Sequence, residues 1–382
     1  MSNASLWFWV SFGAFLVSLA MSYVLLGLSK LSRVGQDRAL GVQKVHTGPT
    51  SRLGGVAIAM SFLAAQVMLA WLGPTSTAGL PDRATQMLGL LLLAAAPVFL
   101  GGLVEDLTHK VLPSLRLSLA LLSAGLAYWL LGAGVFKTDV FLVDALLSIP
   151  AAPFFVTLLV VAGFTQSVNI VDGFHGLASG SMVIAAGGLM LISWQCNDGL
   201  LTFLCSLVIA SVSGFFLLNW PHGKIFLGDA GAYLVGFWVV LLGLMLVQRN
   251  PSVSPMTPVL IAIFPLVETL FSMYRRKFIR QHPVNHPDNL HLHSLIYRRL
   301  VCGKFSPGPH RSAQDKKAQA NARVACYFWV PGLVFAALAI ALKASTTAQL
   351  TLMLVYVGMY VWLYQRLVSF RAPVWLKRFI RC

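Results

Sequence analysis

The sequence predicts an all-α, polytopic integral membrane protein with about eleven transmembrane helices. Of the 382 residues, 57% are hydrophobic and only 10% are charged, whereas a typical soluble domain carries about 25% charged residues. Apolar runs of about 20 residues, the length that crosses a bilayer as a helix, recur along the whole chain. The five cysteines form no CxxC pair, which argues against a disulfide framework and against a cysteine zinc site.

Eleven apolar segments are long enough to cross a bilayer. In chain order they are residues 6–28, 54–72, 86–104, 115–132, 147–166, 177–194, 200–219, 230–247, 256–273, 324–342 and 349–365. The fifth segment is the least regular, because Pro150 and Pro153 interrupt its start. The longest polar connection, about 274–323, is too short to bury a core of its own. Residues 1–382 are therefore expected to form one integral membrane domain.

The basic residues predict the orientation of these spans. With the N-terminus outside, only four of the 28 Lys and Arg residues fall in outer loops, and the other 24 lie on the inner side. The inner segments are about 29–53, 105–114, 167–176, 220–229 and 274–323, with the tail 366–382. Cytoplasmic loops of membrane proteins carry such an excess of Lys and Arg. Topology thus explains the net charge of +16 without a nucleic-acid partner, and the C-terminus is expected in the cytoplasm.

Five of the twelve acidic residues share one predicted face of the membrane. They lie at the inner ends of spans and are Glu105, Asp106, Asp172, Asp229 and Glu268. An acid at the bilayer centre costs about 2.5–3.5 kcal/mol on insertion scales, so acids near spans are functional candidates. Independent surface acids would not be expected to choose one face, which favours a shared site. Clustered carboxylates without cysteine suit a hard cation such as Mg²⁺, with Mn²⁺ as an alternative.

Two of these acids are adjacent, and a third follows an asparagine by one helical turn. Glu105 and Asp106 would point about 100° apart on a helix, so that one could bind metal while the other faces a second group. Asn169 and Asp172 are spaced i,i+3 and would share a face if helical. A polar helix end and a capped turn, respectively, are the structural alternatives.

The last two acids have distinctive neighbours. Asp229 opens span eight within Gly228-Asp229-Ala230-Gly231, and a helix start with small residues can bind phosphate, although Asp229 could instead serve as the N-cap. Glu268 lies about two helical turns before Arg275 and Arg276, and could simply pair with them.

Cations and histidines lie on the same predicted face. Lys44, His46 and Arg52 precede span two. His291 and His293 in the last inner loop are spaced i,i+2, so they face the same side only where the backbone is extended. A zinc site is one interpretation, but no cysteine is nearby. An anion clamp suits cations and histidine donors better. A cytoplasm-facing pocket of carboxylates, Mg²⁺ and cations fits phosphoryl or nucleotidyl transfer to a membrane-embedded substrate.

These motifs together resemble the polyprenyl-phosphate N-acetylhexosamine-1-phosphate transferases, glycosyltransferase family 4. The similarity runs from about residue 40 to 300. Five family motifs have counterparts here in the same order. Glu105-Asp106 resembles the family's paired acids, and residues 169–176 resemble its N-x-x-D-G-x-[DN]-G motif. Residues 226–231, 265–276 and 291–294 resemble its F-x-G-D-x-G, P-x-x-D-T…R-R and H-x-H-H motifs. Any one motif is weak evidence, but five in order on one membrane face are specific.

The resemblance implies a fold of ten or eleven helices in the bacterial inner membrane, and a homodimer. It implies transfer of a sugar 1-phosphate from a UDP-HexNAc to undecaprenyl phosphate, with Mg²⁺, releasing UMP. No Ser, Cys or His beside a base stands out as a nucleophile, so direct attack by the lipid phosphate is expected. In the implied site Asp229 is the main metal ligand, aided by Asp106, and Glu105 and Asp106 lie near the lipid phosphate.

The resemblance also assigns the substrate groups. Asp172 with Asn169 would hold or polarise the nucleotide end. The groups implied to bind pyrophosphate and sugar are His291, His293, Arg275 and Arg276, and Lys44, His46, Arg52 and His175 are further substrate-binding candidates.

Three departures from the family pattern bear on the donor. Glu105 replaces the first Asp, His175 stands where Asp or Asn is usual, and Ser294 replaces the final His. With the altered first loop, these favour the branch that starts O-antigen or other surface polysaccharides over the peptidoglycan branch. The expected donor is UDP-GlcNAc or a deoxy relative such as UDP-FucNAc or UDP-QuiNAc.

Three other functions fit this set of motifs less well. A transporter for an anionic solute would place its groups near the membrane midplane. A CDP-alcohol phosphatidyltransferase would carry D-G-x-x-A-R, whereas Asp172-Gly173 continues as Phe-His-Gly. An inactive scaffold would not be expected to keep Asp106, Asp172 and Asp229.

Overall fold

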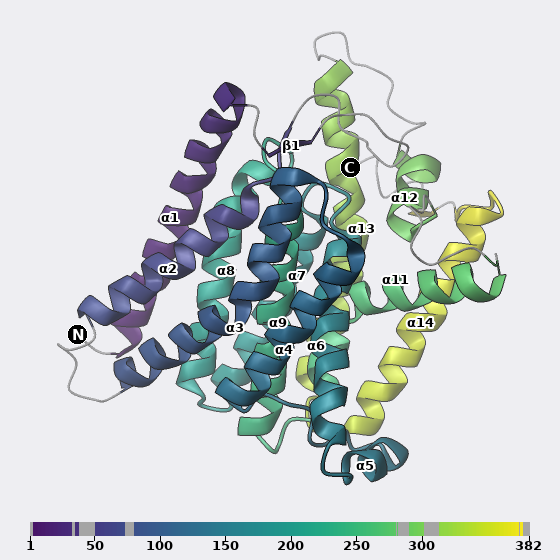
Figure 1. The fold of residues 1–382 in the computed structure, drawn as a ribbon. Helices are drawn as coiled ribbons and strands as arrows, with labels where there is room; N and C mark the ends of the chain where they lie inside the picture. The colour runs from purple at the N-terminus through teal and green to yellow at the C-terminus, as the bar shows by residue number, and fades with distance from the viewer. Residues whose placement is uncertain are drawn as a thin grey trace.

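The computed structural model describes residues 3–32, 35–37, 50–72, 80–279, 281, 290–301, 313–373 and 375–376. This part of the chain is almost entirely helical (Figure 1). The helices are α1 (Asn3–Ser32), α2 (Gly54–Leu72), α3 (Leu80–Thr108), α4 (Pro113–Leu131), α5 (Phe141–Leu147), α6 (Ala152–Val171), α7 (Leu177–Gln195), α8 (Gly199–Asn219), α9 (Gly228–Arg249), α10 (Met256–Ile261), α11 (Ile263–Tyr274), α12 (Leu292–Ile296), α13 (Ala313–Ala341) and α14 (Thr346–Val368). Two π-helical turns, η2 (Arg275–Ile279) and η3 (Tyr297–Val301), extend α11 and α12, and two-residue strands β1 (Gln36–Asp37) and β2 (Thr50–Ser51) pair antiparallel.

Ten of the described helices are long and apolar enough to cross a membrane. This confirms the predicted all-α, polytopic membrane fold. Helix α9 is the central one. In its most apolar stretch 83% of the residues are buried inside the protein, whereas the buried share in the other nine helices is 17–61%. The outward faces of α1 and α14 carry exposed aromatic and aliphatic side chains such as Phe8, Trp9 and Leu354, as expected of surfaces that contact lipid.

The long helices alternate between two ends of the bundle, called the upper and lower ends after Figure 1. The upper end holds the ends of α3, α6 and α8 and the starts of α2, α4, α7, α9 and α13. The lower end holds α5 and the opposite helix ends. Polar contacts tie the lower end together: Arg249 at the end of α9 donates to Asp198 before α8 at 2.6 Å, and Lys343 after α13 donates to Gln195 of α7 at 2.6 Å.

The predicted ninth span, residues 256–273, is wrong as a single helix. The chain breaks at Ala262 (φ −107°, ψ 28°) into α10 and α11. Pro265 explains the break, because a proline cannot donate to the carbonyl four residues earlier, here Ile261, and its ring collides with that carbonyl. Figure 1 shows α11 running across the direction of its neighbours. Helix α9 ends at the lower end and α13 starts at the upper end, and α10 and α11 are the first described helices of the segment that connects them.

The fifth span also starts later than expected. Residues 141–147 form the separate short helix α5, and α6 begins only at Ala152. Pro153 lies in the first turn of α6, where its fixed φ and missing N–H are tolerated. In contrast, α3 continues past its expected end at residue 104 to Thr108, which places the adjacent acids in its last turn.

Candidate active site

The N-terminus of α9 is held by an early segment of the chain at the upper end of the bundle. Phe226 N donates to Ser51 O at 2.7 Å, and Gly54 N and Gly55 N donate to Phe226 O and Leu227 O at 3.0 and 2.9 Å. A Cβ at Gly55 would lie 2.2 Å from the backbone nitrogen of Gly231. The starts of α2 and α9 therefore meet backbone to backbone, and Arg52 is fixed beside α9.

Asp106 caps α9 from the last turn of α3. Its Oδ1 and Oδ2 accept from the backbone N–H groups of Asp229 and Ala230, each at 2.9 Å. The Asp106 side chain is fully buried, and Oδ1 also lies 3.1 Å from Arg52 Nε. The alternative that Asp229 is the N-cap is wrong, because α9 already starts at Gly228. Asp106 supplies the negative charge that a helix N-terminus favours, and this contact competes with the predicted role in metal binding.

Gly228 makes this approach sterically feasible. Its φ is +74°, and a Cβ there would lie 2.1 Å from the Arg52 carbonyl oxygen and 2.6 Å from Asp106 Oδ2. Only glycine avoids both the left-handed backbone penalty and this collision. Glycine is therefore required at position 228, immediately before Asp229, for the start of α9 to reach Asp106 and Arg52.

Asp229 lies between two arginines, an arrangement called here the arginine clamp (Arg52, Asp229 and Arg116). Arg52 Nη2 donates to Asp229 Oδ1 at 2.6 Å, and Arg116 Nη1 donates to Oδ2 at 2.9 Å. Both arginine side chains keep about a fifth of their surface exposed. The clamp thus presents two partly solvated cations over one carboxylate, an arrangement suited to binding phosphate and metal together.

Asn169 reaches the same carboxylate from α6. Its Nδ2 donates to the Tyr233 hydroxyl at 3.0 Å and lies 3.5 Å from Asp229 Oδ2. Asp172 caps the end of α6, and its carboxylate accepts from Gly228 N. Asn169 and Asp172 therefore both face α9, but Asp172 does so from the non-helical turn that caps α6 (φ −77°, ψ 53°), which is the capped-turn alternative. Burial raises the pKa of Asp172 to about 7, with further increases from Asp229 and Asp106 opposed by Arg52.

Glu105 points away from Asp106, as expected for adjacent helical residues. Its Oε2 accepts from Val111 N at 2.8 Å, and its Oε1 lies 3.9 Å from Arg116 Nη1. Glu105 thus supports the turn between α3 and α4 and lies at the edge of the clamp.

Glu268 forms a second cluster with the two predicted histidines. Its side chain is fully buried; Oε1 accepts from His291 Nδ1 at 2.9 Å, and Oε2 lies 3.8 Å from His293 Nδ1. His291 is extended (φ −59°, ψ 146°) immediately before α12. The two rings, called here the histidine pair, stack with their centroids 5.1 Å apart. The two rings therefore lie on the same side of this segment, as extended backbone predicts, and Glu268 contacts them and not Arg275 or Arg276.

Arg275 supports this cluster from below. The side chain is buried, and Nη1 donates to the carbonyl of Leu290 and, at 2.6 Å, to the Tyr364 hydroxyl. It thereby ties η2 and α14 to the segment that carries the histidine pair. Arg276 is partly buried in the same π-helical turn.

The two clusters meet at the turn after α6. A Cβ at Gly173 would lie 3.6 Å from His293 Nε2, and the Phe174 ring packs edge-on against His293 with centroids 5.4 Å apart. Asp172 in the same turn touches the start of α9. The acids predicted to share a site are thus contiguous at the upper end, from the clamp through this turn to Glu268.

His175 faces a different direction. Its backbone N–H donates to Asn321 Oδ1 at 2.7 Å, and its Nδ1 lies 3.2 Å from the Pro221 carbonyl. The ring packs against Phe226 and beside Gly223. These contacts hold the α8–α9 connection to α13, and the ring is buried away from the clamp. Lys44 and His46 lie outside the described residues.

The sequence reasoning missed Arg116 and Tyr233. Arg116 is a lone cation within an apolar span and near its start, and that position was a usable signal. Tyr233 lies one turn after Asp229, is fully buried, and accepts a hydrogen bond from Asn169 through its hydroxyl. Its place beside Asn169 follows only from the packing of α6 on α9.

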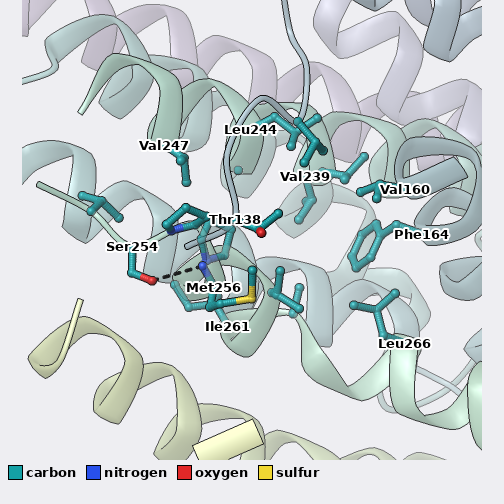
Figure 2. Close-up of a pocket in the computed structure, with 18 of the residues that line it drawn as sticks. Thr138, Val160, Phe164, Val239, Leu244, Val247, Ser254, Met256, Ile261 and Leu266 are labelled. Carbon is teal, nitrogen blue, oxygen red and sulfur yellow. Dashed lines mark hydrogen bonds between the residues drawn. The ribbon is translucent and has the colours of Figure 1, made fainter. Parts of the chain in front are cut away.

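An apolar groove of about 920 Å³ runs along α6, α9, α10 and α11 (Figure 2). Val160, Phe164 and Leu266 are among the side chains that line it. It extends from Lys137 and Ser252 at the lower end to Ser167 and Thr269. Ser167 precedes Asn169 by two residues and Thr269 follows Glu268, so the groove reaches the edge of the candidate site.

The donor set at Asp229 fits a hard divalent cation. Within the described ranges, no three His, Cys, Asp or Glu side chains converge on one point. Mg²⁺ does not require this, because it is usually held by one or two carboxylates with water and substrate phosphates. Both Asp229 oxygens pair with arginines, so a metal ion at this carboxylate would have to share or displace these contacts.

Comparison with known proteins gives the same assignment as the motifs. The family model for glycosyl transferase family 4 matches residues 88–247, from the middle of α3 to the end of α9. A probable undecaprenyl-phosphate N-acetylglucosaminyl 1-phosphate transferase of Bacillus subtilis is 27% identical over 90% of this chain and 88% of its own length.

Undecaprenyl-phosphate α-N-acetylglucosaminyl 1-phosphate transferases of Yersinia pestis and Escherichia coli K12 are each 33% identical to the chain. These matches cover 37% and 38% of the chain and only 40% and 41% of the two relatives.

Proposed function

Because the chain belongs to the polyprenyl-phosphate N-acetylhexosamine-1-phosphate transferases of glycosyl transferase family 4, we propose that it is a phosphoglycosyltransferase. The proposed reaction moves a HexNAc 1-phosphate from a UDP-sugar to undecaprenyl phosphate and releases UMP. The observation that carries this proposal is the arginine clamp, together with an apolar groove whose lining ends at Ser167, two residues before Asn169. It combines groups for a diphosphate with a surface for a long lipid.

In the proposed reaction an oxygen of the lipid phosphate attacks the sugar-linked phosphorus of the donor. The bond from this phosphorus to the bridging oxygen breaks, and the electron pair leaves with UMP. Arg52 and Arg116 would hold the diphosphate oxygens and stabilise the charge on the departing phosphate. The second pKa of a phosphate monoester is about 6, so the lipid phosphate is already largely ionised at neutral pH. A strong general base is therefore unnecessary.

Mg²⁺, with Mn²⁺ as an alternative, is proposed as the cofactor. Asp229 would hold it together with substrate phosphates, and Asp106 lies next to this position with both oxygens on the α9 N-terminus. When bound, the ion supplies positive charge at the phosphates. Asn169 and Tyr233 would keep the Asp229 carboxylate in place.

The groove is the proposed site for the polyprenyl chain. Its walls are mainly aliphatic and aromatic, and they come largely from α6, α9, α10 and α11. Burial of isoprenoid carbon in such a groove is favourable at about 25 cal/mol per Å². Because the groove ends near Ser167 and Thr269, a lipid within it would carry its phosphate toward the clamp.

Direct transfer without a covalent enzyme intermediate is proposed. The groups described around the clamp are carboxylates, arginines, an amide and a phenol. No serine or cysteine lies beside a base there in the described residues. Isolation of a phosphosugar adduct on the protein after incubation with the donor alone would contradict direct transfer.

UDP-GlcNAc is the first donor to test, because the relatives above are N-acetylglucosaminyl transferases by name. UDP-FucNAc and UDP-QuiNAc follow. The proposed pathway is the start of O-antigen or another surface polysaccharide. The proposed location is the bacterial inner membrane, with the upper end in the cytoplasm, the N-terminus outside and the protein as a homodimer.

The test is UMP release by protein purified in detergent. UDP-HexNAc donors are supplied with and without undecaprenyl phosphate and Mg²⁺. Release that needs all three, and is lost in Asp229→Asn, supports the proposal. The matched control is Asp198→Asn, a carboxylate at the lower end that pairs with Arg249 and should leave the rate unchanged. No release from folded protein with any donor would refute it.

The same variants distinguish a transferase from an anionic-solute transporter. A transporter places its binding groups near the membrane midplane, whereas the clamp lies at helix ends. Solute uptake into liposomes that is lost in Asp229→Asn, with no UMP release, would favour the transporter.

A further inference from the structure

Glu268 is a buried carboxylate whose role the proposed reaction leaves open. It lies in α11, fully buried, just beyond the break at Ala262. Removing a carboxylate from water costs several kcal/mol unless hydrogen bonds and opposite charge compensate. Its nearest cations in sequence, Arg275 and Arg276, do not pair with it, since Arg275 binds Leu290 and Tyr364. Its compensation therefore comes from the segment after residue 289.

That segment wraps around the carboxylate. Oε1 accepts from the Leu292 N–H at 3.2 Å and contacts His291 Nδ1 at 2.9 Å. Oε2 and His293 Nδ1 face each other at 3.8 Å. Neither atom makes a hydrogen bond of standard geometry within the described part of the chain, although the Tyr360 hydroxyl of α14 also contacts the Glu268 carboxylate. One carboxylate thus faces the same nitrogen of both stacked rings, and Figure 1 shows α11 passing below α12.

This geometry determines which edge of each ring is available. Oε1 already accepts a backbone N–H, so we take His291 Nδ1 as the donor to Glu268, with the Ser272 hydroxyl, 3.1 Å from the same nitrogen, as a second acceptor. A ring whose Nδ1–H is held by a carboxylate keeps Nε2 on its opposite edge, with higher basicity. For His293, Nε2 lies beside Gly173, in the turn whose Asp172 touches the start of α9.

We propose that Glu268 is a positioning residue that holds Nδ1 of the histidine pair inward, so that both Nε2 atoms serve the sugar-diphosphate end of the donor. The proposal rests on the proposed function for the identity of this ligand. On binding the anionic diphosphate, Nε2 of His291 takes up a proton and donates to a phosphate oxygen. The Glu268 carboxylate stabilises the resulting imidazolium.

The first test reads the tautomer directly and does not need activity. ¹⁵N spectra of histidine-labelled protein in detergent are assigned with His291→Asn and His293→Asn. The expected result is a His291 signal with the proton on Nδ1, which shifts or becomes a tautomer mixture in Glu268→Gln. A wild-type His291 with its proton on Nε2, or a spectrum unaffected by Glu268→Gln, would overturn the proposal.

The second test is a double-mutant cycle on UMP release. Glu268→Gln is expected to lower kcat/KM for the UDP-sugar by about 10–100-fold, the usual loss when a supporting partner of a histidine is removed. In a His291→Ala background the same change should cost about twofold or less, because coupled residues are not additive. Glu268→Asp, which keeps the charge, should recover part of the activity. Equal losses in both backgrounds would indicate a merely structural carboxylate.

The two tests separate failure of the inference from failure of the proposed function. If wild-type protein releases no UMP while the spectra show Nδ1–H that depends on Glu268, the positioning role stands and the proposed reaction fails. If UMP is released but the cycle is additive, the reaction stands and the positioning role fails. Asp198→Asn is the control for loss of a buried carboxylate elsewhere.

Discussion

Replacing Asp106 with asparagine should destabilise the protein more than it weakens metal binding. The fully buried carboxylate accepts two backbone N–H groups of α9 at 2.9 Å and lies 3.1 Å from Arg52 Nε. Asparagine keeps one acceptor but turns an NH₂ group toward the other N–H. Loss of one charge-assisted hydrogen bond costs about 1.5–3 kcal/mol, and loss of a charge at a helix N-terminus costs about 0.3–2 kcal/mol. The sum is about 2–5 kcal/mol.

The assay is thermal unfolding in detergent, followed by the fluorescence of the ten tryptophans, together with Mn²⁺ binding by electron paramagnetic resonance. Asp106→Asn should lower the apparent melting temperature by several degrees. Glu105→Gln is the matched control on the same helical turn. It loses one backbone contact, to Val111, and should shift the melting temperature much less. An unchanged melting temperature with complete loss of Mn²⁺ binding would refute the capping role and restore Asp106 as mainly a metal ligand.

Four further outcomes are expected. Arg116→Gln should slow UMP release. Because it removes a cation from Asp229, it should also tighten Mn²⁺ binding in the absence of nucleotide by about fivefold, which corresponds to about 1 kcal/mol for a partly exposed ion pair. An unchanged Mn²⁺ affinity would contradict the clamp. Gly228→Ala should yield little folded protein on size exclusion, since its Cβ would lie 2.1 Å from a carbonyl oxygen, whereas Gly187→Ala, with no atom within 4 Å, should fold normally. Burial lowers the pKa of His293 from 6.5 to about 3, so between these pH values the unfolded chain binds a proton at this residue and the folded chain does not. The contribution of His293 to stability is therefore full above pH 6.5 and falls by up to about 1.4 kcal/mol per pH unit below it. The melting temperature of His293→Gln should accordingly vary less than that of the wild type from pH 7 to 5. Val160→Trp should fill the groove and raise KM for undecaprenyl phosphate with KM for the UDP-sugar unchanged, and equal effects on both would place the lipid elsewhere.

Hydropathy was sufficient to predict most of the fold, because a bilayer requires a long apolar run for each crossing. It failed where proline acts on the backbone. The segment 256–273 is apolar throughout, yet Pro265 divides it at Ala262. The proline was visible in the sequence, and its effect on the residue four positions earlier was predictable. That α11 would then run across the bundle was not, because this depends on its contacts with α13 and α14.

The candidate site was predictable in membership and less so in arrangement. Acids at apolar helix ends are costly, so Glu105, Asp106, Asp172 and Asp229 stood out. Which atoms they bind depends on packing between segments far apart in sequence. The partner of Asp106 is a helix start more than 100 residues later, and no local pattern encodes that contact. His175 occupies a motif position, yet its ring turns toward Pro221.

The dependence of the α9 N-terminus on earlier segments has a consequence for biogenesis. Asp106 and Asp172 are synthesised well before residues 228–230, whose N–H groups they bind. Until the eighth long helix is inserted, these carboxylates lie at helix ends without their main partners. A nascent chain that stalls before this step therefore carries acids at the membrane boundary without the backbone N–H groups that they bind in the folded protein. Such a chain should be recognisable to a membrane protease, and docking of α9 should be the step that protects it from degradation.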